Sequence, residues 1–363
     1  MSKIISIGTA VPAHRHRQYD ILDFMTRVYA LNPVEARKLR FLYHQSGIES
    51  RHSVLGDYGK PPEEWKFYPA AESMEPFPGL EQRMEAYKKH AAPLSLDAIR
   101  RCLQHMDKNK PITHLITVSC TGMSAPGLDL ELMELLDLPR NINRSSVNFM
   151  GCYAAIHALK MADYICKAEP AARVLLVCTE LCTLHFQKEA TTDNLASSLL
   201  FADGSAAALV TADTAEEEGL CLHRFYSEVV PKGKKDMSWE LSSSGFLMTL
   251  SGYVPDLIEA DFLPLVNRAM QDTEYSLARI GHWCIHPGGK KILDVIRKQL
   301  QLPQTALEHS ETVLRENGNM SSPTLLFVLK RIMDEQQQSG THKPVFAAAF
   351  GPGLTMETFI AHS

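Results

Sequence analysis

The sequence contains no uncharged hydrophobic run of about 18 residues, the length that a membrane-spanning helix requires. It also has no basic surplus, since 37 Lys and Arg stand against 42 Asp and Glu and give a formal net charge of −5. Proteins that bind nucleic acid usually carry an excess of positive charge. We therefore expect neither a membrane span nor a nucleic-acid partner, and any lipid-like substrate would be bound inside a soluble fold.

The eight cysteines show no C-x-x-C pair and no Cys/His spacing typical of a zinc or redox site. No secretory leader is recognisable, because the basic run HRHR (14–17) follows the first apolar stretch instead of preceding it. A disulfide framework is also not expected in a chain of this kind. The cysteine pattern thus predicts reduced thiols, a cytoplasmic location and no metal ion.

The 363 residues, 45% of them hydrophobic, are enough to bury a large core. Candidate strands and amphipathic helices alternate, which predicts an α/β architecture with a mostly buried central sheet. The candidate strands are 3–10, 112–120, 145–150, 172–181, 205–212, 221–230, 278–286 and 343–350. The candidate helices are 81–107, 128–137, the segment after Cys152, 255–272, 289–300 and 321–335.

The chain divides at an acidic stretch, residues 211–219, after which the alternation restarts. FADGSAAALV (201–210) closes the first half and VFAAAFGPGLT (345–355) closes the second in a similar way. This similarity predicts an internal duplication with halves 1–213 and 220–363. Segments 51–80 and 231–244 are rich in Pro, Gly, Ser and charge, and we expect them to be surface excursions.

Three turns carry residue types suited to catalysis. Cys152 follows the strand candidate 146–149 and begins a helix, where the helix dipole and free N–H groups favour the thiolate. His286 ends another strand and precedes Pro287 and two glycines, and Asn319 lies in a turn just before a helix. Ligand sites of α/β proteins gather at the carboxyl ends of strands, so these residues are expected to converge.

Cys152, HPGG (286–289), GNMSS (318–322) and FGPG (350–353) stand in an order and spacing that resembles the type III polyketide synthases, the chalcone synthase-like family. Cys120, at a position where plant members often carry threonine, resembles the bacterial type. The resemblance covers essentially the whole chain. It implies a thiolase-like fold, in which two duplicated βαβα halves form a five-layered αβαβα core, and a homodimer.

The resemblance also implies the reaction. An acyl-CoA starter would be loaded on Cys152, extended with malonyl-CoA by decarboxylative condensation and released by cyclisation, with no cofactor beyond the coenzyme A thioesters. His286 would pair with the Cys152 thiolate. His286 and Asn319 would together donate hydrogen bonds to the enolate that forms when malonyl-CoA loses carbon dioxide. The half from 1 to 213 then carries the nucleophile, and the half from 220 to 363 carries His286 and Asn319.

Further residues are assigned by the resemblance alone. The positions that match the family's substrate cavity are Phe201, Met248, Cys120, Cys182, His185 and Ser321. Met248 stands where the family usually has a second gating phenylalanine, and its flexible thioether leaves room for a longer acyl chain. Together with the small Ala125, it favours a fatty acyl starter and an alkylpyrone or alkylresorcinol product.

Coenzyme A binding is expected to depend on lysines. Lys38 matches one of the family's basic phosphate contacts, whereas the other two fall near the uncharged Phe41 and Gln45. Lys290 and Lys291 follow the HPGG turn, and we hypothesise that they restore attraction for the phosphates at a helix start. Replacing both by glutamate should raise the KM for malonyl-CoA markedly, as measured by initial rates, and an unchanged KM would refute the hypothesis.

Two alternatives to a type III polyketide synthase stay open. A ketoacyl synthase III-like enzyme would perform a single condensation on an acyl carrier protein, and HPGG and FGPG argue against it. A non-catalytic homologue would bind an acyl chain or serve as a partner subunit. The intact set of Cys152, His286 and Asn319 disfavours that alternative.

Overall fold

Nine strands form one continuous sheet in the computed structural model, which describes all residues except 72, 108 and 215–216. From one edge to the other, the strands are β11 (His282–Ile285), β12 (Val345–Gly351), β13 (Thr355–His362), β8 (Leu220–Val229), β1 (Ser2–Ala10), β7 (Asp203–Ala212), β6 (Arg173–Leu181), β4 (His114–Ser119) and β5 (Asn143–Asn148). Two antiparallel strand pairs lie outside this sheet: β2 (His14–Arg17) pairs with β3 (Ser50–Ser53), and β9 (Met237–Ser242) forms a hairpin with β10 (Gly245–Leu250).

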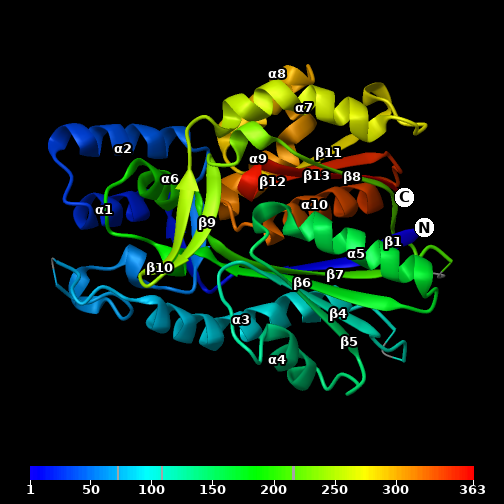
Figure 1. The fold of residues 1–363 in the computed structure, drawn as a ribbon, viewed down its shortest axis with the longest axis horizontal. Helices are drawn as coiled ribbons and strands as arrows, with labels where there is room; N and C mark the ends of the chain where they lie inside the picture. Colours follow the sequence, from blue (N-terminus) through cyan, green and yellow to red (C-terminus); the bar gives the residue numbers. More distant parts are fainter. Residues whose placement is uncertain (72, 108, 215–216) are drawn as a thin grey trace.

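The two halves of the sheet are joined only by a short pairing of β1 with β8, through residues 2–4 and 220–222. The halves diverge beyond this pairing and lie in two separate layers. Figure 1 shows the result as five layers: helices, strands, helices, strands, helices. The layers are completed by α3 (Leu80–Leu103) and α4 (Leu128–Leu135) on one side, α5 (Ala154–Ala168) and α10 (Pro323–Ser339) in the middle, and α7 (Val254–Met270) and α8 (Lys290–Gln299) on the other side. The expected five-layered thiolase-like fold is therefore confirmed.

The internal duplication is visible in the strand pairing. In the first half β4 pairs parallel with β6, which pairs antiparallel with β7, which pairs antiparallel with β1. In the second half β11, β12, β13 and β8 repeat the same sequence of parallel, antiparallel and antiparallel pairs. By this order β7 corresponds to β13, and the two similar motifs noted in the sequence lead into these strands: FADG (201–204) runs into β7, and FGPG (350–353) links β12 to β13.

Three hydrophobic cores hold the layers together. The largest lies between the two half-sheets and contains α5, α10 and the facing sides of the strands. Ala154, Ala155, Ala158 and Ala162 of α5 are completely buried there, and such small side chains let the helix pack closely against both half-sheets. The second core lies under α3, and the third lies under α7 and α8. Strands β6 and β7 are buried along their whole length, which explains the apolar runs VLLVC (174–178) and AAALV (206–210) within them.

The prediction that segments 51–80 and 231–244 are surface excursions is only partly right, because residues such as Glu63 and Lys232 are exposed but other side chains of the two segments are buried. Arg51, Tyr58 and Tyr68 are at most 4% exposed and fill a second layer of packing beside α1 (Gln18–Val28) and α2 (Pro33–Gln45). Residues 237–242 form strand β9, whose pairing with β10 places Trp239 opposite Met248. Turn-forming residues made these segments look like loops, although their aromatic side chains are used for packing.

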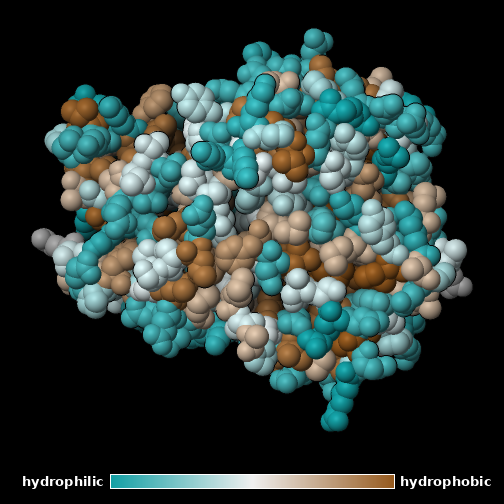
Figure 2. All heavy atoms as spheres, viewed as in Figure 1, coloured by the Kyte–Doolittle hydropathy of each residue, from teal (hydrophilic) through white to brown (hydrophobic). Residues whose placement is uncertain are grey.

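The remaining helices are short and lie at the edges of the layers, namely α6 (Thr192–Leu200) and α9 (Glu308–Asn317). The two chain termini lie on the same side of the molecule (Figure 1). Part of the acidic stretch 211–219 falls outside the described residues. Among the described residues, every helix is too short or too polar to cross a bilayer. The face in Figure 2 has hydrophobic surface across its middle, between hydrophilic upper and lower edges.

Candidate active site

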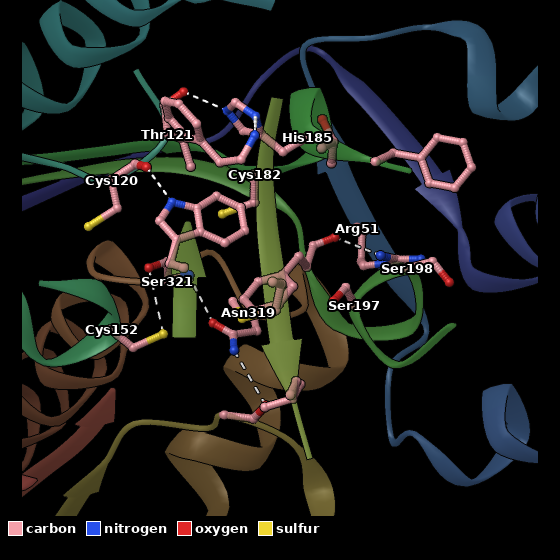
Figure 3. A pocket seen from close by; sticks show the side chains of 18 of the residues that line it. Arg51, Cys120, Thr121, Cys152, Cys182, His185, Ser197, Ser198, Asn319 and Ser321 are labelled. Carbon is pink, nitrogen blue, oxygen red and sulfur yellow. Dashed lines mark hydrogen bonds between the residues drawn. The ribbon is translucent and has the colours of Figure 1, made fainter. Parts of the chain in front are cut away.

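One deep pocket brings together the three turns that the sequence marked for catalysis. Cys152, His286 and Asn319 all line it, although they come from three separate segments of the chain. Its remaining walls come from the end of β4, the turn after β6, helix α6 and the β9/β10 hairpin. Figure 3 shows the interior, with Cys152, Asn319 and Ser321 close together on one side of the pocket.

Cys152 lies in a single 3-10 turn, Gly151–Tyr153, between β5 and α5. The backbone turns sharply there, since Phe149 and Gly151 both have positive φ, 57° and 77°. Position 151 admits only glycine because an added Cβ would lie 2.3 Å from Cδ of Pro352. The FGPG motif thus packs its backbone and proline against the turn that carries Cys152.

The electrostatics of the thiol differ from the sequence expectation. Burial raises the pKa of Cys152 to about 11, and the nearby Ser321 hydroxyl, whose Oγ lies 3.6 Å from Sγ, only partly offsets this rise. A helix start is typically worth 0.3–1 kcal/mol, or less than one pKa unit. The helix start therefore does not offset the desolvation of the thiol by itself, and a thiolate at Cys152 needs a further partner, the role expected of His286.

His286 follows β11 directly and is fixed through its backbone N–H, which donates to the Ala348 carbonyl at 2.9 Å. The side chain is buried, and neither ring nitrogen has a hydrogen-bond partner among the described residues. Burial lowers the pKa of His286 to about 3, so the free ring is neutral at pH 7. An imidazole buried without partners is costly to maintain, which indicates that its nitrogens serve a bound molecule.

The orientation of the Asn319 amide is determined by its neighbours. Its Oδ1 accepts a hydrogen bond from the backbone N–H of Ser321 at 2.8 Å, so its NH2 group must point the other way. That group makes one long contact, 3.4 Å, to the Gly288 carbonyl. The residue is also anchored by its backbone, which exchanges hydrogen bonds with Leu200 and Ala202. Asn319 therefore presents an N–H donor beside Cys152 (Figure 3).

Phe201 ends helix α6 and forms an isolated bridge with Asn319. Its carbonyl accepts a hydrogen bond from Nη1 of the buried Arg51 at 2.6 Å, and Nε of Arg51 donates to Gln18 at 2.9 Å. Gly318, with φ 70°, leaves room for Arg51, since an added Cβ would lie 2.7 Å from its Cγ. Arg51 therefore holds the Phe201 and Asn319 segments in register.

The other predicted cavity residues also line the pocket: Cys120, Cys182, His185, Met248 and Ser321. His185 is a wall residue, because both its ring nitrogens are occupied. Nε2 is 2.7 Å from the Thr121 carbonyl, and Nδ1 accepts the Phe246 N–H at 3.1 Å. Its ring stacks on Phe246 at 4.3 Å, and burial lowers the pKa of His185 to about 3.

Sequence reasoning missed two residues that shape the pocket. Trp239 of β9 donates from Nε1 to the Cys120 carbonyl at 2.7 Å and forms part of the wall. Glu180, completely buried at the end of β6, accepts hydrogen bonds from the Cys120 N–H, the Thr121 hydroxyl and the Ser322 hydroxyl. Burial raises the pKa of Glu180 to about 7. The sequence signal for Glu180 was its position as a carboxylate within the mostly apolar strand ARVLLVCTEL (172–181).

The residues expected to bind coenzyme A do not line the pocket. Lys290 and Lys291 begin α8 and pair with Asp294 at 2.5 Å and Asp256 at 3.3 Å. Lys290 lies beside Gly47, just beyond the end of α2, the helix that carries the exposed Lys38. Their role in phosphate binding stays a prediction. Ala125 is exposed and is not among the lining residues, so it gives no support to a longer cavity in this chain.

Comparison with known proteins gives a consistent picture. Residues 1–214 match the family model for the N-terminal domain of chalcone and stilbene synthases, and residues 221–363 match the model for the C-terminal domain. The crystal structure of PKS-I from the brown alga Ectocarpus siliculosus superposes with a TM-score of 0.93 at 27% identity, covering 100% of this chain and 98% of that one.

Curated relatives point the same way. The chain is 28% identical over 359 residues to the alpha-pyrone synthesis polyketide synthase-like Pks18 of Mycobacterium tuberculosis, covering 98% of this chain and 89% of that protein. It is 31% identical over 366 residues to the probable polyketide synthase 1 of Dictyostelium discoideum. That alignment covers 98% of this chain but only 11% of the much longer Dictyostelium protein.

Proposed function

This chain belongs to the chalcone and stilbene synthase family and is a type III polyketide synthase, and from this premise we propose which residues carry the reaction and which starter it takes. Cys152 holds the growing acyl chain as a thioester. His286 and Asn319 bind the thioester oxygen of malonyl-CoA and stabilise the enolate left after decarboxylation. The buried His286, with both ring nitrogens free in a pocket shared with Cys152, is the observation that carries this assignment.

The separate roles of Cys152 and of the pair His286 and Asn319 follow from where charge develops in the reaction. Loss of carbon dioxide places negative charge on the thioester oxygen, and a neutral imidazole N–H and an amide N–H both stabilise it. The acyl group on sulfur keeps an electrophilic carbonyl, which the enolate carbon attacks. The new carbon–carbon bond forms as the carbon–sulfur bond breaks, so the Cys152 thiolate is released with the chain now on coenzyme A. Returning that chain to sulfur permits another extension.

The thiol must lose its proton to accept an acyl group, and we propose that His286 takes it. Burial disfavours either charge alone, but a thiolate and an imidazolium that form together stabilise one another. Burial alone leaves the Cys152 thiol protonated near neutral pH, because it raises the pKa to about 11. Movement of the imidazole or the sulfur by substrate binding would bring the two into contact.

Replacement of His286 by alanine is therefore expected to shift the alkylation profile of Cys152 to higher pH. An imidazolium lowers a neighbouring thiol's pKa, so its removal should leave Cys152 with the raised pKa that burial alone imposes. At pH 7, iodoacetamide should label the variant at least about tenfold more slowly than the wild type, as followed by peptide mass spectrometry. Cys221, on β8, serves as an internal control, and identical profiles for Cys152 in both proteins would refute the proton transfer.

We further propose a medium-length or long fatty acyl-CoA as starter and an alkylpyrone or alkylresorcinol as product. The apolar side chains that line the pocket support this: Ile21, Met25, Phe186, Met237, Phe246, Met248 and Leu250. Pks18, whose name refers to alpha-pyrone synthesis, is among the relatives. A product profile by mass spectrometry, with malonyl-CoA and starters from acetyl-CoA to lauroyl-CoA, tests the proposal, and a preference for acetyl-CoA would contradict it.

The variant Met248→Phe sharpens this test. A rigid ring in place of the thioether should cost about 1–3 kcal/mol of overpacking when a long chain is bound, but little with acetyl-CoA. We expect kcat/KM for lauroyl-CoA to fall about tenfold or more relative to acetyl-CoA. The matched control is Leu247→Phe, since Leu247 is the adjacent residue of β10 and is exposed. Equal losses for both starters would mean that Met248 does not face the acyl chain.

The homodimer is part of this proposal. Large exposed hydrophobic side chains, such as Met123, Leu135 and Tyr164, offer a surface that a second copy would cover. The cytoplasmic location is proposed from the eight cysteines, which are all free thiols in the structure.

A further inference from the structure

Three residues of the second half place their ligating atoms together outside the active site. One ligand atom from each of His282, His309 and Glu335 lies within 4.8 Å of the other two. In the sequence they are separated by 27 and 26 positions, so no local motif announced the cluster. His282 is the first residue of β11, His309 lies in the first turn of α9, and Glu335 lies near the end of α10.

The cluster has an unsatisfied ligand. Nε2 of His282 is buried and has no hydrogen-bond partner among the described residues. Nε2 of His309 already contacts a carboxylate oxygen of Glu335, and the rings of His282 and His309 lie with their centroids 6.3 Å apart. A buried nitrogen without a partner is unfavourable, and a cation between these three side chains would satisfy it.

We propose that His282, His309 and Glu335 bind a divalent transition-metal ion of the Zn²⁺ class. Two imidazoles and one carboxylate are a donor set that suits Zn²⁺ and related ions, and a solvent molecule would complete a tetrahedral site. Ligands of tetrahedral zinc lie about 3.4 Å from one another at bond lengths near 2.1 Å, so small side-chain rotations would close the cluster. The side chain of Glu335 is half exposed and can rotate. Its negative charge also counteracts the positive charge of Lys343 near His282.

The position of this site gives it a structural consequence. Each cluster residue lies at one end of its element, and the opposite end of that element lies next to the active site. His286 follows β11, Asn319 follows α9, and Ser322 precedes α10. Ser310, next to His309, donates to the Ile285 carbonyl at 2.7 Å and already joins α9 to the end of β11. A metal ion would add a second clamp between the same elements, about 10–20 Å from the catalytic side chains by helix and strand rise.

The test is titration of the full-length, chelator-treated protein with Zn²⁺ alone by isothermal titration calorimetry. We expect one ion per chain with a Kd in the micromolar range or tighter, and a rise in Tm that follows saturation. His309→Gln and Glu335→Gln should each weaken binding by about 10–100-fold. His105→Gln, an exposed histidine of the first half, should leave it unchanged.

The thiol of Cys152 is a competing ligand, so the titration is repeated after its alkylation with iodoacetamide. Binding that survives alkylation and is lost in His309→Gln supports the site. Absence of binding overturns the proposal, and so does binding that is equal in the wild type and both cluster variants, which would mean an adventitious ion only. This outcome is independent of the polyketide synthase assays, which require no added metal.

Discussion

Replacement of Cys152 by alanine is expected to reduce polyketide formation by about 10⁴-fold or more, because it removes the thiol that we propose as the acyl carrier. The other cysteines of the wall, Cys120 and Cys182, are already committed to packing, and Sγ of Cys120 accepts the Gly151 N–H at 3.1 Å. Product formation from an acyl-CoA and malonyl-CoA, followed by mass spectrometry, measures this loss.

The same variant should still decarboxylate malonyl-CoA, since the donors of His286 and Asn319 remain in place. Carbon dioxide release from labelled malonyl-CoA would then be uncoupled from chain extension. Cys221→Ala is the matched control, because Cys221 is also a partly exposed thiol but lies on β8, where it contacts Asp213. If Cys152→Ala kept full condensing activity, the covalent mechanism would be excluded.

Replacement of Asn319 by aspartate is expected to slow malonyl-CoA decarboxylation by about 10²–10³-fold at pH 8, the usual effect of losing one oxyanion donor. The substitution is nearly isosteric, and aspartate can still accept the Ser321 N–H that orients the side chain. What changes is the NH2 group, which becomes an oxygen that repels the developing enolate. The rate of carbon dioxide release isolates this step from chain extension.

The pH dependence of Asn319→Asp shows whether its lower rate comes from the negative charge of the carboxylate or from a change in side-chain shape. A buried carboxyl without a cationic partner has a raised pKa, so lowering the pH should protonate Asp at this position and restore an O–H donor. We expect the deficit to shrink between pH 8 and pH 6. Asn317→Asp, in the last turn of α9, is the control, because Asn317 donates to the Val313 carbonyl and does not line the pocket. A deficit that is independent of pH would contradict the charge argument.

The strand and helix pattern was predictable because most elements are buried on at least one face. Helices α3, α7, α8 and α10 and strands β4, β6, β7 and β12 lie within a few residues of their predicted bounds. The three turns that meet at the pocket were also predictable, since glycine and proline positions such as Gly151 and Pro287 mark where the backbone can approach another segment closely.

The errors have a common cause. Trp239 and the aromatic residues of 51–80 lie in segments rich in turn formers, and the sequence does not reveal that these turns fold back over the pocket. Glu180 was overlooked because its burial depends on hydrogen bonds from Cys120, Thr121 and Ser322, which are distant in the chain. The desolvation of Cys152 could not be read from the sequence, because helix position is local, whereas desolvation depends on everything packed around the sulfur.

The sequence by itself determined the α/β layering and the identity of the three turns, because periodicity and turn chemistry are encoded by neighbouring residues. Only the tertiary structure decided which way the Asn319 amide points, that His286 is left without partners, and that His282, His309 and Glu335 meet. Hydrogen-bond satisfaction, burial and ligand geometry are sums over atoms brought together from the whole chain, and no segment of it contains them.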